Sequence, residues 1–488
     1  MIFANVEYDE SYDVIVVGYG GAGAVAAITA HDCGATVLIL EKQPPDTPTE
    51  IRHTPSTRMC GAMFICPTNP HQAAEYLKHC SRGTTAESIC EVWAKYAVEN
   101  ADWLRKRGAQ VFEFRGEGPE FPMFPGAESI RVFGVKYKGL HGGEALFRLL
   151  SDQVNSRRIQ VIYDTPARKL IADNNRQVVG VTTGKETTFR ARRAVILTCG
   201  GFEWDDEMKL DYLRADPFYF YCNPANTGDG VRMAQDVGAA LWHMNAISGR
   251  VIPKIPGMIP AMMGGTPRNR FILVDKYGRR FVKERPLVDH SFWLEVCYFD
   301  TQRAEYPRIP CYSIFDEAAR LQGPVASSPP KGALSDGKMR YFYRWSHDNL
   351  VEVEKGWIIK GGTVEELACK LGMDRGILES TIAEYNDYCK SGVDREFARA
   401  RETLVPIDRP PYYGMQMFPG GPNTQGGPRR NSKAQVLDVF GNPIRRLYAA
   451  GELGSIYGFL YPASGGNVAE LIAFGRIAGE NAAAERCQ

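Results

Sequence analysis

The chain lacks the residue spacings that identify metal-binding and disulfide-rich proteins. Its 12 cysteines form no C-x-x-C pair, and the nearest two are Cys60 and Cys66. This scatter argues against a disulfide scaffold, a zinc knuckle or an iron–sulfur cluster. The eight histidines show no H-E-x-x-H or comparable spacing, so we expect no metal site.

Strong net charge and long apolar runs are also absent. The formal net charge is +1, so no extended field would attract nucleic acid or an acidic membrane surface. No apolar run approaches the ~20 residues that a membrane-spanning helix needs, so we expect no integral membrane segment. The start, MIFANVEYDESYD, is acidic and has no basic region followed by an apolar one, so we expect a cytoplasmic location.

What remains is an ordinary globular composition in a long chain. Hydrophobic residues make up 44% and charged residues 24% of 488 residues. This length exceeds what one core usually serves, which predicts two domains. Because the residue composition changes and prolines become frequent after residue 244, we expect a second domain over 245–404, inserted between 1–244 and 405–488.

The first forty residues carry the most specific local pattern. An apolar run over 14–17 predicts a buried strand, and it enters G-Y-G-G-A-G, in which Gly18, Gly20 and Gly23 fit G-x-G-x-x-G. Gly18 permits a tight turn, Gly20 lets the backbone approach a pyrophosphate, and Gly23 lets helix and strand pack closely. The pattern predicts a dinucleotide site, and the alternative is a glycine-rich turn in an unrelated α/β domain.

The segments around this turn complete the pattern. An Ala-rich helix over 24–31 would offer its N-terminal N–H groups to phosphates. A second apolar strand over 35–40 ends at Glu41, where an acid can bind a ribose hydroxyl. Further expected helices are within 71–107 and at 144–154, 226–238 and 468–485; expected strands are at 159–163, 167–173, 178–183, 187–190, 194–197, 434–438 and 447–450, with a hairpin at 272–282.

Longer motifs give the chain a family resemblance. They are V-I-V-V-G-Y-G-G-A-G, A-V-I-L-T-C-G-G-F-E, N-T-G-D-G-V-R-M-A, F-I-L-V-D-K-Y-G-R-R-F-V-K-E, and L-Y-A-A-G-E with S-G-G-N-V-A-E-L-I-A-F-G-R-I-A-G. In this order, and over nearly the whole chain, they resemble the fumarate reductase/succinate dehydrogenase flavoprotein superfamily. The resemblance implies FAD and an α/β fold, in which a split Rossmann-type FAD-binding domain carries an inserted α+β cap that binds substrate.

Several residues are expected at the FAD because they match the family's motifs. Glu452 matches the acid that binds the ribityl chain, and Asp229 matches an acid near the ribityl or phosphate part. Either acid could instead cap a helix or form an ion pair in a loop. The N–H groups at 466–468 match a helix N-terminus whose dipole stabilises negative charge on the flavin. The other expected cofactor residues are Gly18, Gly20, Gly21, Ala22, Gly23, Glu41, Lys42, Met59, Cys60, Gly61, Ala62, Ala167, Gly200, Ser464, Gly466, Asn467 and Val468.

Two arginines that the family's dicarboxylate reductases use are missing. One delivers a proton from the fourth position after G-x-R-F-x-x-E, where this chain has Val288. The other clamps a substrate carboxylate within H-G-x-N-R-x-G-G-N, where this chain has Ala463, with Tyr457 in place of the histidine. Because a guanidinium fork is the natural partner of a carboxylate, fumarate, succinate and aspartate are poor candidate substrates.

The stretch that replaces the second arginine resembles another branch of the superfamily. Tyr461-Pro462 followed by Ser464-Gly465 resembles the Y-P-x-x-G element of 3-ketosteroid dehydrogenases, in which the tyrosine hydroxyl and the glycine N–H hold a ketone oxygen. Two such donors form an oxyanion hole that lets the β-carbon of an enone accept hydride. We therefore expect Tyr461 and Gly465 to be catalytic, and the alternative for Tyr461 is a packed core aromatic.

Proton transfer needs a further group. The ketosteroid dehydrogenases that form a ring double bond carry a tyrosine base where this chain has Val288. The candidates here are His290, beside that position, Tyr457, near Tyr461, and water. A histidine in a loop can equally be structural.

The expected function is that of an FAD-dependent oxidoreductase acting on a CH–CH or C=C bond conjugated to a ketone. The enzyme would be either an enone reductase or a ketosteroid-type dehydrogenase, and its substrate would be apolar and cyclic. We infer no separate NAD(P)H domain, because no second G-x-G-x-x-G has this setting, and the electron donor or acceptor is left open. One alternative is a reductase of an unsaturated carboxylic acid, clamped by Arg268, Arg270, Arg279 or Arg285, and another is a non-catalytic flavin-binding sensor or scaffold.

Overall fold

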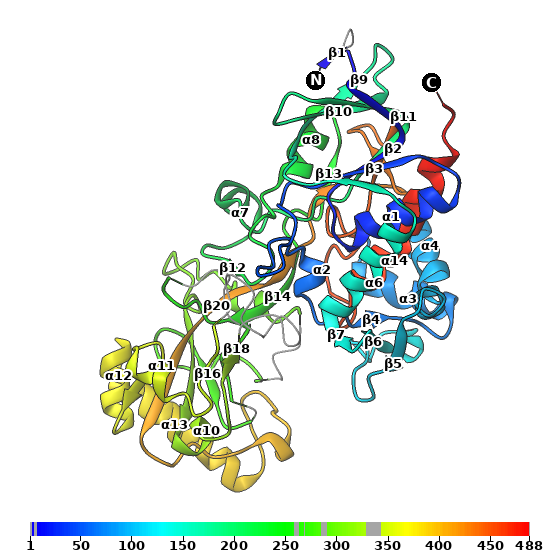
Figure 1. The fold of residues 1–488 in the computed structure, drawn as a ribbon. Coiled ribbons are helices and arrows are strands. Elements are labelled where there is room, and N and C mark those ends of the chain that lie inside the picture. Colours follow the sequence, from blue (N-terminus) through cyan, green and yellow to red (C-terminus); the bar gives the residue numbers. More distant parts are fainter. Residues whose placement is uncertain are drawn as a thin grey trace.

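The chain folds into two bodies connected by long strands. The computed structural model describes residues 2–3, 7–257, 263–267, 269–284, 290–327 and 343–487. In Figure 1 the upper body contains the N- and C-terminal segments, and the middle of the chain forms the lower body. Strands β14 (Ile247–Ile252) and β20 (Tyr412–Thr424) lie between the two.

The upper body is built on a large sheet with a parallel centre. Its order is β1-β9-β10-β11-β2-β3-β8, and β23 pairs with both β11 and β22. All of β3 and the last five residues of β2 are buried, as parallel strands covered on both faces require. The strands are β1 (Ile2–Phe3), β2 (Glu10–Val17), β3 (Val37–Leu40), β8 (Gln160–Ile162), β9 (Ala167–Ala172), β10 (Val178–Thr183), β11 (Thr188–Leu197), β22 (Gln435–Leu437) and β23 (Pro443–Ala449).

Helix α1 (Gly21–Asp32) packs closely along α14 (Gly466–Ala484), beside α6 (Gly142–Ser156). A Cβ at Gly475 would lie 2.9 Å from the Val25 side chain, and one at Gly479 would lie 3.0 Å from the backbone nitrogen of Ala30. Glycine is needed where two backbones approach this closely. The two helices run in the same direction, so their N-termini meet at the same edge of the sheet.

A helical layer supports the loop that precedes α14. It consists of α3 (Pro70–Ser81), α4 (Glu87–Ala97) and α5 (Asn100–Arg105), with a small sheet of β4 (Phe64–Ile65), β5 (Gln110–Glu113), β6 (Val132–Tyr137) and β7 (Leu140–His141). The Tyr76 hydroxyl donates to the Pro462 carbonyl at 2.7 Å, and the Thr85 hydroxyl donates to the Ile456 carbonyl at 2.7 Å. These bonds fix the loop over 456–462.

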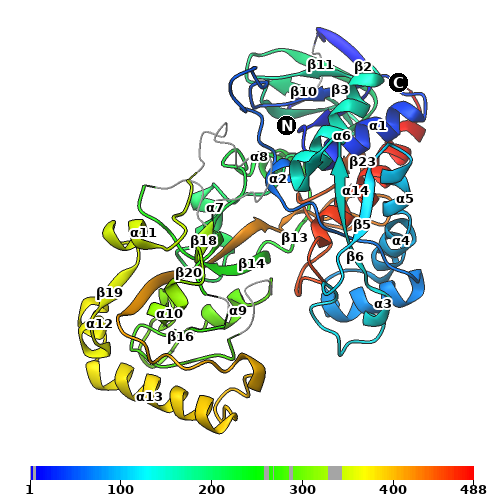
Figure 2. The ribbon, with the colours of Figure 1, turned by 60° about the horizontal axis from the view of Figure 1, so that its bottom comes forward.

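The lower body has its own sheet, in the order β12-β20-β17-β16, with β14 and β19 also paired to β20. Its strands, besides β14 and β20, are β12 (Tyr219–Phe220), β16 (Ile272–Val274), β17 (Cys311–Asp316) and β19 (Ile359–Gly361). Helices α12 (Val364–Leu371) and α13 (Arg375–Ser391) lie at the end far from the upper body (Figure 2). Inside, the buried Arg280 pairs with Glu284 at 2.7 Å and with Asp394 at 2.9 Å, so the buried charges compensate one another.

The remaining elements are short connections. They are α2 (Ser56–Met59), α7 (Asp206–Tyr212), α8 (Asp229–Asp236), α9 (Trp293–Val296), α10 (Glu317–Arg320), α11 (Leu350–Glu354), the 3-10 helices at Ala127–Ser129 and Arg401–Thr403, and strands β13 (Leu241–Trp242), β15 (Met263–Gly264), β18 (Ala326–Ser327) and β21 (Gly427–Pro428). No helix in the described part of the chain is long and apolar enough to cross a membrane. The described residues also contain no group of three or more His, Cys, Asp or Glu side chains that could hold a metal ion.

Two features differ from the sequence expectation. Strands were expected separately at 187–190 and 194–197, but β11 runs through both, and a register shift between Ala191 and Ala194 absorbs the polar pair between them. The second sheet takes β12 and β20 from outside 245–404. The domain limits therefore stay a prediction, because one sheet crosses them on both sides.

Candidate active site

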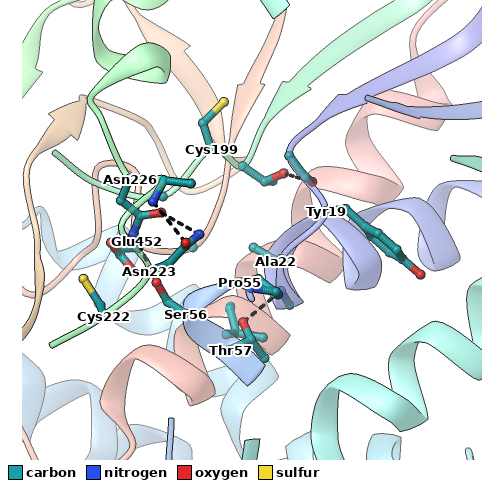
Figure 3. A pocket seen from close by; sticks show the side chains of 18 of the residues that line it. Tyr19, Ala22, Pro55, Ser56, Thr57, Cys199, Cys222, Asn223, Asn226 and Glu452 are labelled. Carbon is teal, nitrogen blue, oxygen red and sulfur yellow. Dashed lines mark hydrogen bonds between the residues drawn. The ribbon is translucent and has the colours of Figure 1, made fainter. Parts of the chain in front are cut away.

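A cavity opens at the carboxyl ends of β2, β3 and β11, the edge at which open α/β sheets bind their ligands (Figure 3). It encloses about 1190 Å³, counting the part open to solvent. The expected cofactor residues that line it are Gly18, Gly20, Gly21, Ala22, Glu41, Lys42, Met59, Cys60, Ala167, Gly200, Asp229, Glu452, Asn467 and Val468.

Five expected cofactor residues are not part of this lining: Gly23, Gly61, Ala62, Ser464 and Gly466. Gly23 lies beneath the turn, against the Gly18 carbonyl. Ala62 and Ser464 are buried, Gly61 faces solvent, and Gly466 donates its N–H to the Ala463 carbonyl at 3.1 Å. For these five residues a cofactor contact therefore stays a prediction.

The glycine turn has the geometry that its spacing predicts. Gly18 has φ +102°, and a Cβ there would lie 2.6 Å from the Thr198 carbonyl oxygen. A Cβ at Gly23 would overlap the Gly18 carbonyl oxygen. At Gly20 the nearest protein atom to a new Cβ is 3.8 Å away, so the backbone borders open space on the cavity side. The turn is therefore crowded inside and open where a ligand would approach.

Glu41 is a buried acid whose carboxylate is held from several sides. It accepts the Tyr19 N–H at 2.7 Å and the Gln43 N–H at 2.7 Å, and His53 Nε2 lies 3.5 Å away. Burial raises the pKa of Glu41, but the His53 contact and the two backbone N–H groups outweigh it, so the pKa is lowered overall. The Tyr19 ring stacks on His53 at 5.4 Å. Glu41 therefore presents a fixed negative charge at the cavity.

On the opposite side of the cavity Glu452 is a buried acid. Figure 3 shows it grouped with Asn223 and Asn226, across from Ala22 and Thr57. Its Oε1 accepts the Gly201 N–H at 2.9 Å and the Asn226 amide at 3.0 Å. Burial, reinforced by the neighbouring Glu203, raises the pKa of Glu452 well above its ordinary value.

Asp229, the first residue of α8, lines the cavity and pairs with Lys42 at 2.7 Å. The ion pair that the sequence analysis gave as its alternative role is therefore present together with the cavity position. Lys42 also donates to the Thr227 hydroxyl at 2.9 Å. The Lys42–Asp229 pair therefore places one positive and one negative group side by side in the cavity lining.

The far end of the cavity is formed by the start of α14. Gly465 is its N-cap, with φ +86°, and lies against the backbone of Met63. The buried ion pair between Arg430 and Glu470 anchors the first turn, and Arg430 also donates to the Ala449 carbonyl at 2.9 Å. Cys60 lines the cavity nearby, and burial raises the pKa of its thiol to about 11, so the thiol is protonated.

These features fit a flavin dinucleotide. The N-termini of α1 and α14 both border the same cavity, and a helix N-terminus stabilises negative charge such as that of phosphate groups. The open face at Gly20 leaves room for close backbone approach. Glu41, the Lys42–Asp229 pair and Glu452 supply hydrogen-bonding groups for hydroxyls between the two ends.

Tyr461 lies next to the start of α14, and its hydroxyl oxygen accepts the Asn467 N–H at 2.7 Å. The side chain is buried, and burial is the main cause that raises the pKa of Tyr461, with the Asn467 N–H and the nearby Ser248 hydroxyl lowering it. At neutral pH the hydroxyl is therefore protonated and can donate. Asn467 lines the cavity, so Tyr461 is one hydrogen bond from its wall.

His290 packs against Tyr461, with ring centroids 4.6 Å apart. Its Nδ1 bonds Glu120 at 2.5 Å, and its Nε2 accepts from Arg250 at 2.9 Å. Burial, followed by the charge of Arg250, holds the pKa of His290 well below its ordinary value. Both ring nitrogens are therefore engaged within the protein, and His290 is neutral.

Tyr457 has a different environment from Tyr461. It is 2% exposed, donates to the Gly466 carbonyl at 2.9 Å and packs edge-on against Trp93. It does not border the cavity. The structure gives it a supporting contact with the start of α14, and we assign it no proton transfer.

Two of the four arginines offered as the clamp of an acid substrate, Arg270 and Arg279, lie away from this site. Arg270 pairs with Asp316 inside the lower body, and Arg279 is an exposed residue of the 275–279 turn. Arg268 and Arg285 lie outside the described residues, as does Val288. Arg250 and Glu120, which the sequence analysis did not single out, lie here instead. No local motif marks them, because β14 and the 114–126 loop meet only in the folded chain.

Comparison with known proteins agrees with this geometry. Residues 13–468 match the family model described as FAD binding domain. The NADH:fumarate oxidoreductase of Klebsiella pneumoniae (strain 342) is 28% identical over 97% of this chain, which spans only 48% of that protein. The 3-oxosteroid 1-dehydrogenase of Mycobacterium tuberculosis (strain ATCC 25618 / H37Rv) is 30% identical over 96% of this chain and 98% of that protein.

A solved structure shows the same fold. The 3-ketosteroid delta1-dehydrogenase from Sterolibacterium denitrificans, in complex with 1,4-androstadiene-3,17-dione, matches with a TM-score of 0.83 over 97% of this chain and 99% of that one, at 24% identity. The relatives are enzymes, which sets aside a non-catalytic sensor. The chain belongs to the FAD binding domain family that includes fumarate reductases and ketosteroid dehydrogenases, and it is an FAD-dependent oxidoreductase acting on carbon–carbon double bonds.

Proposed function

We propose that the double bond is conjugated to a ketone, and that Tyr461 and Gly465 hold the ketone oxygen of an apolar, cyclic substrate. The observation that supports this proposal is that both hydrogen-bond donors are free to bind a ligand oxygen. The Tyr461 hydroxyl accepts the Asn467 N–H and keeps its own proton available, while the Gly465 N–H has no hydrogen-bond partner among the residues that the structure describes. Two such donors directed at one oxygen stabilise an enolate.

The chemistry that FAD would supply when bound is hydride exchange with the β-carbon of the substrate. The chain's residues do the rest in this proposal. Tyr461 and Gly465 polarise the ketone, and burial of Tyr461 lowers the local dielectric constant, which strengthens its hydrogen bond. Because both nitrogens of His290 are engaged and Tyr457 is buried, we propose that water exchanges the α-carbon proton.

The proposal also places the cofactor along the cavity. The α1 turn at Gly20 would hold the pyrophosphate, Glu41 a ribose, and Glu452 the ribityl chain, with the flavin ring at Asn467 and Val468. Reduction and dehydrogenation are the two directions of one reaction at these residues.

The test is anaerobic stopped-flow reoxidation of the photoreduced holoenzyme, followed by flavin absorbance. We expect rapid reoxidation by cyclic enones, and a loss on the order of 10²–10³ in rate for Tyr461→Phe without loss of FAD. Tyr385→Phe is the matched control, because that hydroxyl bonds the Val405 carbonyl in the lower body. If enones did not reoxidise the flavin and an unsaturated acid reoxidised it rapidly, the proposal would be overturned in favour of the acid reductase.

A further inference from the structure

Arg250 belongs to β14 and lies near Tyr461. Ser248 of the same strand is also near Tyr461, and the pairing of β14 with β20 shifts register between these two residues. The Ser248 hydroxyl is close enough to lower the pKa of Tyr461, and Arg250 bonds the His290 ring that packs on Tyr461 at 4.6 Å. Arg250 is also near Tyr221, which lines the cavity. Two separate neighbours thus place its guanidinium beside the ketone-binding donors.

A chain of hydrogen bonds holds this guanidinium in place. Arginine has only donors, so His290 Nε2, 2.9 Å from Arg250 Nη2, must accept. The imidazole proton then lies on Nδ1 and is donated to Glu120 at 2.5 Å. Glu120 also accepts the His290 N–H at 3.1 Å and donates its own N–H to the Pro462 carbonyl at 3.0 Å. His290 and Glu120 are therefore positioning residues for Arg250.

The charge of Arg250 is not compensated by contact. Among the described residues no carboxylate lies within 4.0 Å of it, whereas Arg270, Arg280 and Arg430 each pair directly with an acid. The neutral His290 separates Arg250 from Glu120. The Arg250 Nε atom is buried and has no hydrogen-bond partner in the described part of the chain. Keeping a half-buried cation with an unused hydrogen-bond donor costs free energy unless an anion pairs with it.

We propose that Arg250 binds a carboxylate that the substrate carries in addition to its conjugated ketone, so that the substrate class is unsaturated keto acids. The inference rests on the proposed ketone chemistry. Guanidinium donors match a carboxylate in a forked geometry, and two fixed points, the ketone at Tyr461 and the carboxylate at Arg250, orient the substrate between them.

The experiment compares a cyclohexenone that bears a carboxymethyl group with its methyl ester, which removes the charge and keeps the ring. We expect wild-type holoenzyme to bind the acid more tightly than the ester by isothermal titration calorimetry and to show a higher kcat/KM for it. Arg250→Met should lower both preferences roughly 10–100-fold, the usual effect of losing a hydrogen bond to a charged group, because binding and turnover of the acid fall far more than those of the ester. Arg250→Lys should retain part of the preference, and Arg279→Gln, which removes an exposed charge, should retain all of it.

The binding measurement separates this inference from the proposed function. Equal losses for acid and ester in Arg250→Met, or an unchanged dissociation constant for the acid, would overturn the carboxylate assignment. Tight, Arg250-dependent binding of the acid without turnover would instead overturn the ketone chemistry and leave the anion site standing. Tyr461→Phe should slow turnover of the acid and of the ester equally, which distinguishes the role of Tyr461 from that of Arg250.

Discussion

Replacing the glycines of the first turn one at a time separates folding from cofactor binding. At Gly23 a new Cβ would overlap the Gly18 carbonyl oxygen and lie 2.8 Å from the Thr198 hydroxyl, so the start of α1 must move. At Gly20 the nearest protein atom would be 3.8 Å away, which is ordinary contact. Gly23→Ala therefore strains the protein itself, whereas Gly20→Ala places a methyl group only where the cofactor approaches.

The magnitudes follow from this difference in space. A methyl group forced into a packed site costs about 1–3 kcal/mol, and we expect Gly23→Ala to lower the free energy of unfolding of the apoprotein by that amount. Gly20→Ala should change it by less than about 0.5 kcal/mol, as a surface substitution does. It should weaken FAD binding at least ~10-fold, which corresponds to ~1.4 kcal/mol.

Two measurements on each variant check this prediction. Urea unfolding of the apoprotein, followed by circular dichroism, reports stability, and quenching of flavin fluorescence reports FAD affinity. Gly118→Ala is the control, because no atom lies within 4 Å of a Cβ built there. The reasoning would be refuted by a Gly20→Ala apoprotein that unfolds as early as Gly23→Ala yet binds FAD normally.

Amide substitution of the two buried acids of the cavity should affect FAD affinity to different extents. Glu452→Gln should keep FAD affinity within about threefold, because burial and Glu203 raise the pKa of this acid and so favour its neutral form, which an amide resembles. Glu41→Gln should weaken FAD affinity at least ~10-fold, because the pKa of that acid is lowered and its carboxylate accepts two N–H groups. Fluorescence titration would contradict this prediction if the order of the two effects were reversed. For pH, the pKa of His290 lies well below its ordinary value, so the ring stays neutral, and between about pH 6 and 8 the KM for a neutral enone should not change. A rise in KM near pH 6.5, the ordinary pKa of histidine, would show that Glu120 and Arg250 do not hold the ring as described.

The part of the fold nearest the cofactor could be predicted because its signals are local. The run 14–17, the glycines after it and Glu41 are contiguous, and the structure confirms strand, turn, helix and strand as β2, α1 and β3. Strand β20 could not be predicted, because Pro419 and the glycines beside it normally interrupt strands. They are tolerated here because a Cβ at Gly420 would overlap Tyr219 and one at Gly421 would overlap Ser248, so close strand packing requires glycine.

The same distinction separates Arg250 from two of the four arginines that the sequence offered as a clamp for an acid substrate. Arg270 and Arg279 lie close in sequence to a recognisable motif, but Arg270 is neutralised by Asp316 and Arg279 faces solvent. Whether an arginine can bind a substrate anion depends on whether the folded protein already supplies its counter-ion, and that depends on contacts between distant segments. Arg250 reaches the site because β14 pairs with β20, and its support, Glu120, comes from 170 positions before His290. A neutral imidazole between the cation and the acid fixes the position of Arg250 without cancelling its charge, so Arg250, unlike Arg270, keeps a charge that an anionic group could compensate.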